Sequence, residues 1–159
     1  MTVREVLDAA RDAALEIRLI EEQAEIRRAA IGVQGHSYGV HSKTGILDPM
    51  RKVDELLEWQ EQEIDAYDLR QPIDEAWDIV RGIARIADNL MVEVVTRYYL
   101  QGASWREILA DSTDRIAEVI DAFDTLSERN KIKSIEGAVN DSIDQWESIG
   151  IAHLKEMGR

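Results

Sequence analysis

Apolar residues recur along most of the chain at the three- and four-residue spacing of an amphipathic helix, and strand-like alternation is nowhere sustained. The first apolar stripe lies between residues 2 and 31 and includes Leu7, Ala14 and Ile20, with charged residues between them. A single stripe on so long a helix needs a second helix to cover it. The pattern therefore predicts an all-α fold that opens with a long N-terminal helical hairpin.

Breaks in the pattern divide the rest of the chain. Pro49 and Pro72 are expected in the first turns of two helices, where the missing amide hydrogen costs nothing. Later stripes predict helices over residues 90–100, 104–110, 112–128 and 135–157. Glycines gather between residues 32 and 45 and predict a flexible loop over 32–47. We therefore expect two domains: the hairpin, residues 1–71, and a small helical bundle, residues 72–159, closed by a C-terminal helix.

The most informative local pattern is the segment 97–108, which reads Arg-Tyr-Tyr-Leu-Gln-Gly-Ala-Ser-Trp-Arg-Glu-Ile. Its aromatic helix end runs into Gly102, which can adopt the left-handed conformation that ends a helix. Ser104 and Glu107 have the spacing of a capping box, in which each side chain accepts a hydrogen bond from the other residue's backbone. We expect Trp105 to pack between the two helices. Helix, tight turn and capped helix form the first half of a helix-turn-helix.

The wording of this segment resembles the DNA-binding C-terminal region of sigma factors. It is still more similar to the small phage and prophage regulators with a sigma-like end, which are grouped with late-gene transcriptional activators. The order of predicted elements is similar over residues 1–111, and the sequence itself is similar over residues 94–111. It implies a helix-turn-helix over residues 90–128 and a role in transcription, with these motif residues: Tyr98, Tyr99, Gly102, Trp105, Glu107 and Ile108.

Candidate DNA contacts lie at the starts of the two expected motif helices: Ser104, Arg106, Ser112, Thr113 and Arg115. The later cations Arg129, Lys131 and Lys133 could bind phosphate, or could favour a helix C-terminus through the helix dipole. The expected second helix carries mainly carboxylates, which can contact cytosine but are repelled by phosphate. The motif is therefore degenerate.

The formal net charge of −13 opposes DNA binding, because lysine and arginine supply most non-specific affinity for phosphate. Two further functions stay open. The chain could be an acidic protein-binding inhibitor or DNA mimic that targets RNA polymerase or a nuclease of the host. It could also be a structural or assembly adaptor that forms homo-oligomers through the hairpin. A protein partner is expected, and DNA binding by the chain alone should be weak.

Catalytic chemistry has little support in the sequence. There is no cysteine, and the loop histidines His36 and His41 fall short of the three or four ligands of a zinc site, with His153 far away. Nucleophile-elbow, phosphate-loop and metalloprotease motifs are missing. We expect no enzyme activity, no metal and no cofactor. With no membrane-length apolar run and no signal-peptide core, the expected location is the cytoplasm of a bacterial host.

Overall fold

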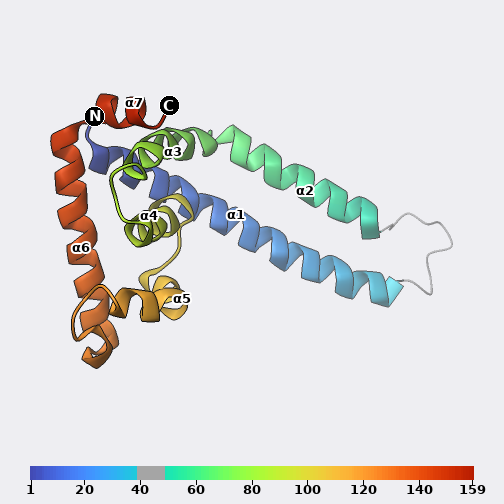
Figure 1. The fold of residues 1–159 in the computed structure, drawn as a ribbon. Helices are drawn as coiled ribbons and strands as arrows, with labels where there is room; N and C mark the ends of the chain where they lie inside the picture. Colours follow the sequence, from blue (N-terminus) through green and yellow to red (C-terminus); the bar gives the residue numbers. More distant parts are fainter. Residues whose placement is uncertain (39–48) are drawn as a thin grey trace. The chain divides into compact units, whose positions relative to one another are not determined.

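A computed structural model describes residues 1–38 and 49–159, with side chains described for 1–31 and 50–159. Every regular element within these ranges is a helix (Figure 1), which confirms the predicted all-α fold. The chain forms two compact units. One joins Met1–Ala14 to Gln71–Arg159 and is called the bundle here; the other is Leu15–Arg70, the hairpin. None of the helices in the described ranges has the length and apolar character to cross a bilayer.

The hairpin unit pairs the later part of α1 (Val3–Tyr38) with α2 (Pro49–Ala66), and the two helices run antiparallel and side by side (Figure 1). Ile20 and Ala24 of α1 are buried, as are Leu56 and Ile64 of α2. These residues recur at helical spacing, so each helix covers the stripe of the other. The predicted hairpin is therefore present.

The ends of the hairpin helices differ in part from the prediction. α2 begins at Pro49 as expected, but α1 continues to Tyr38, seven residues beyond the expected end at Ile31. The glycines at 32 and 35 do not stop it, because glycine costs a helix only about 1 kcal/mol relative to alanine. The rest of the expected loop 32–47, from residue 39 onward, lies outside the described residues.

The bundle unit contains α3 (Arg70–Ile83), α4 (Asn89–Val95), the short π-helical segment η1 (Thr96–Leu100), α5 (Trp105–Ala117), the 3₁₀ turn η2 (Phe123–Thr125), α6 (Glu128–Ile149) and α7 (Ile151–Met157). Its core includes Ile79, Phe123, Ile143 and Leu154, all almost fully buried. Trp146 is buried in the same core, whereas Trp77 is partly exposed on α3. Trp146 therefore anchors the packing of the bundle, whereas Trp77 does not.

The first turns of α1 belong to the bundle rather than to the hairpin, which corrects the expected domain of residues 1–71. Thr2 and Glu5 form a reciprocal capping box, with N···O distances of 2.9 and 3.1 Å. The backbone N–H of Arg4 donates to Glu147 of α6, and its guanidinium donates to Asn140. These contacts are formed by residues more than 130 positions apart, so no local pattern could have indicated them.

Two expected elements of the bundle are wrong. Residues 112–128 do not form one helix: α5 runs through residues 112–113 to Ala117, and Ala122 has a left-handed φ of 59° before η2. The last helix begins at Glu128, seven residues earlier than expected, and Gly150, with φ 89°, separates α6 from α7. The second helix after the Gly102 turn is consequently α6.

Candidate nucleic-acid interface

The turn before α5 has the predicted local geometry. Gly102 is left-handed, with φ 69°, and ends the helical run at Leu100. Ser104 is the N-cap of α5, and its hydroxyl accepts the backbone N–H of Glu107 at 3.2 Å. Ile108 is fully buried one turn into α5. The left-handed glycine and the serine cap are therefore confirmed.

Two stacked aromatic rings and an arginine of α1 pack together at this turn. The rings of Tyr98 and Trp105 stack with centroids 4.0 Å apart, and Arg11 lies 3.5 Å from the Tyr98 centroid. Arg11 also donates hydrogen bonds to the carbonyl oxygens of Tyr98 and Ala103. Trp105 is half-buried, and its indole N–H is buried with no acceptor among the described residues. The sequence could not indicate Arg11, because the contact joins positions 87 and 92 residues apart.

Tyr99 supports the same region from the core side. Its ring meets Tyr98 edge-on with centroids 4.9 Å apart, and it is 5% exposed. Burial, together with the negative charge of Asp8, raises the pKa of Tyr99 to about 12. The hydroxyl therefore stays neutral at physiological pH.

Three of the candidate DNA contacts lie inside α5 rather than at the start of a second motif helix. Ser112 is 2% exposed within α5, which excludes it as a contact residue. Thr113 donates its hydroxyl to the carbonyl oxygen of Leu109, one turn earlier. Arg115 forms an ion pair with Glu93 of α4. Serine and threonine usually favour caps, but burial of one and back-bonding of the other keep both inside the helix.

The remaining candidates lie at the starts of α5 and α6. The Arg106 Nε lies 3.0 Å from an oxygen of Glu128, so the first turn of α5 meets the first turn of α6. Arg106, Arg129 and Lys133 line one shallow surface pocket, and we call these three residues the basic cluster. Lys131 is half-buried on another face, 5.5 Å from the Phe123 ring, so it does not join them.

Both helices at the basic cluster expose their N-terminal ends. Ser127 caps α6 as Ser104 caps α5, accepting the N–H of Asn130 at 3.4 Å. The N-terminal end of a helix carries partial positive charge and favours anions. The cations in residues 129–133 are thus at the start of a helix, which corrects the alternative that they stabilise a helix C-terminus. Ser127 followed by Glu128 was the sequence signal that could have placed this start.

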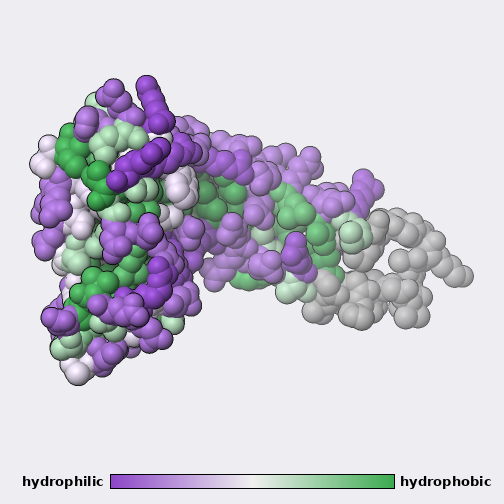
Figure 2. All heavy atoms as spheres, viewed as in Figure 1, coloured by the Kyte–Doolittle hydropathy of each residue, from purple (hydrophilic) through white to green (hydrophobic). Residues whose placement is uncertain are grey.

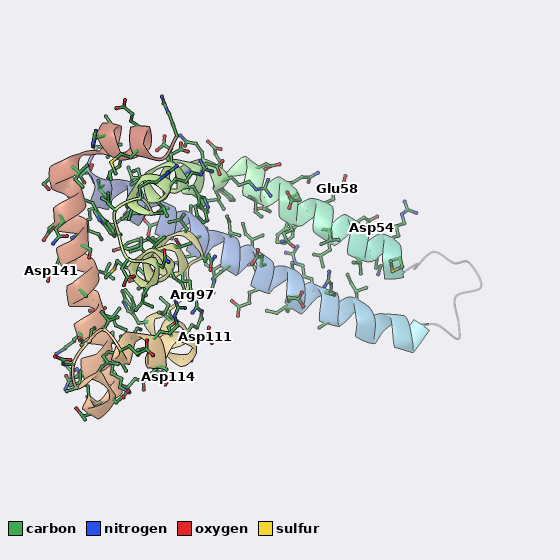
Figure 3. All side chains as sticks on the ribbon, in the orientation of Figure 1. Asp54, Glu58, Arg97, Asp111, Asp114 and Asp141 are labelled. Carbon is green, nitrogen blue, oxygen red and sulfur yellow. The ribbon has the colours of Figure 1, made fainter. Side chains whose placement is uncertain are left out.

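Carboxylates limit the positive charge of this surface. Glu128 and Glu136 line the same pocket as the basic cluster. Arg97 of η1 forms an ion pair with Asp111 of α5 at 2.7 Å, and Asp114 lies nearby on α5 (Figure 3). Asp111 and Asp114 are both exposed, so this part of α5 presents negative charge to the solvent. The arrangement can hold an anion at the basic cluster but repels phosphate along the rest of α5.

Neither a protein-family model, nor a curated protein, nor a solved structure matches the chain. Among the side chains of residues 1–31 and 50–159, no group of three histidines or carboxylates is placed to hold a metal ion. The geometry of the basic cluster therefore carries the functional interpretation.

Proposed function

We propose that this chain is a phage or prophage regulatory protein that acts in transcription through a sigma-like helix-turn-helix. α5 and α6 are the two helices of the motif, and the basic cluster is its phosphate contact. The observation that carries the proposal is the meeting of Arg106, Arg129 and Lys133 at the N-terminal turns of both helices. Cations together with two helix N-termini favour a phosphate at this place.

The same residues imply weak binding by the chain alone. Glu128 is 3.0 Å from Arg106, and the whole chain carries a net charge of −13. Each carboxylate near a phosphate opposes the gain from counterion release. We expect generic duplex DNA to bind at or above the roughly 10⁻⁴–10⁻⁶ M scale of non-specific complexes. Strong association should require RNA polymerase or another partner that adds positive charge.

Fluorescence anisotropy of a labelled random duplex across a salt series tests the proposal. Replacing Arg106, Arg129 and Lys133 together by alanine should weaken binding and lower the salt slope by about 0.9 for each phosphate that is no longer neutralised. The control is the triple alanine variant of Arg81, Lys155 and Arg159, which removes equal charge from another pocket of the bundle. Equal weakening in the two variants would reduce the effect to net charge and refute a specific interface.

A second function is favoured by the exposed carboxylates of α5. Asp111 and Asp114 lie together (Figure 3), and the nearby arginine, Arg97, is paired with one of them. An acidic helix face complements a basic surface on a nucleic-acid-binding protein and speeds their encounter. Surface plasmon resonance with purified bacterial RNA polymerase tests this function. Asp114→Asn should slow association, whereas the same substitution of Asp54 on α2 should not.

A further inference from the structure

We propose that an apolar groove in the bundle is the docking site for one amphipathic helix of a protein partner, with basic residues beside its apolar row. The groove lies between α4, α5 and α6 and shares no residue with the basic cluster. The inference therefore goes beyond DNA contact and describes a separate surface.

The groove has a volume of about 420 Å³ and is lined mainly by apolar side chains. Trp146 and Val139 of α6 are buried in its wall, and Met91 of α4 is half-buried. Two apolar lining residues are largely exposed: Ile86 at 49% and Val119 at 63%. Apolar surface is also visible over the region of α5 and α6 in Figure 2. Exposed apolar side chains beside a concave apolar surface are typical of interaction sites.

The length of the groove indicates a helix rather than a compact small molecule. α6 contributes lining residues from Ile135 to Ile149, which is about 21 Å at 1.5 Å per residue. A volume of about 420 Å³ over that length is a narrow slot. Such a slot accepts a row of large side chains, as an amphipathic helix presents at every third or fourth position.

The charge at the groove indicates which residues should stand beside the apolar row of the partner helix. Asp88 is the one charged residue among the groove-lining residues in the described part of the chain. It is the N-cap of α4, where its carboxylate forms no side-chain capping bond to the described backbone. Lysine or arginine beside the apolar row would meet this carboxylate, whereas a second copy of the chain would bring further negative charge.

Two labelled helical peptides test the docking site. Both have leucine at every third or fourth position, and the flanking residues are lysine in one and glutamate in the other. Anisotropy titration against the full chain should give saturable binding, with the lysine peptide bound about three- to tenfold more tightly. Asp88→Asn, which remains a good helix N-cap, should reduce that preference.

Ala138→Phe places a large side chain on the groove wall and should abolish binding of the lysine peptide. Gly137→Phe is the control, because a Cβ atom at this exposed position on the same helix meets nothing within 4 Å. Circular dichroism melts establish that both variants fold. Absence of saturable binding, or equal affinity for the two peptides, would overturn the proposal. A stable dimer that only Ala138→Phe disrupts would also overturn it, since the occupant would be a second copy.

Discussion

Gly82 lies where α3 and α7 approach backbone to backbone, and its replacement by alanine tests that packing. A Cβ atom at residue 82 would lie 2.6 Å from the carbonyl carbon and 3.0 Å from the Cα of Leu154, with the carbonyl oxygen closer still. A Cβ atom at Gly158 would likewise lie 2.8 Å from the Gly82 nitrogen. Because the obstacle is backbone rather than a flexible side chain, α7 as a whole must move.

The expected cost follows from three contributions. Overpacking a core typically costs about 1–3 kcal/mol. Displacing α7 also begins to expose Leu154, which is fully buried and whose complete burial is worth about 1.5–3 kcal/mol. Alanine within a helix recovers about 1 kcal/mol relative to glycine. We therefore expect Gly82→Ala to lower the free energy of unfolding by about 1–3 kcal/mol.

Thermal and urea unfolding followed by circular dichroism measure this change. At about 2–4 °C per kcal/mol for a chain of this size, the melting temperature should fall by roughly 2–12 °C. Gly137→Ala is the matched control, because its Cβ would meet nothing within 4 Å on exposed α6. It should raise stability by about 0.5–1 kcal/mol. If both variants were stabilised alike, α7 would not pack on α3 and the reasoning would fail.

Three further predictions concern the turn, the core and the basic cluster. Trp105→Phe should melt within a few degrees of the original chain, whereas Trp105→Ala should lose about 1–3 kcal/mol, because phenylalanine keeps the stacked ring and removes a buried N–H that no described residue accepts. Folding raises the pKa of Tyr99 to about 12, so the neutral phenol stabilises the fold fully below about pH 10. This contribution, at most about 2–3 kcal/mol, is lost as the pH rises to about 12. The free energy of unfolding in urea should therefore vary less with pH in this range for Tyr99→Phe than for the original chain, whereas the exposed control Tyr67→Phe should behave as the original chain does. Glu128→Gln should tighten duplex binding about two- to fivefold by anisotropy, and Glu93→Gln, which removes the same charge from another ion pair, should do less.

Features decided by neighbouring residues were predictable from the sequence. The left-handed Gly102 and the Ser104 cap need only a glycine and a serine at a fixed spacing, because the bonds that form them join residues three to six positions apart. The helical class and the hairpin followed from apolar periodicity for the same reason.

Features decided by distant packing were not predictable. Ser112 and Thr113 resemble a helix start locally, yet α5 continues through them because Ser112 is buried against the bundle. Arg11 closes the aromatic stack from a helix almost ninety residues away in sequence. Ser112, Thr113 and Arg115 were expected at the start of a helix and lie inside α5 because that helix continues through them.

The position of Arg129 supports the proposal that the basic cluster serves a ligand. A cation in the first turn of a helix opposes the helix dipole at a cost of about 0.3–1 kcal/mol, and an acid there is favourable. Glu128 follows that rule, but Arg129, in the same first turn of α6, opposes it. The stability of α6 does not favour an arginine there, whereas a phosphate that meets the basic cluster and both helix starts would. The acidic remainder of the chain would then weaken binding to DNA that reaches only part of this surface, and selectivity would arise from where the positive charge is placed.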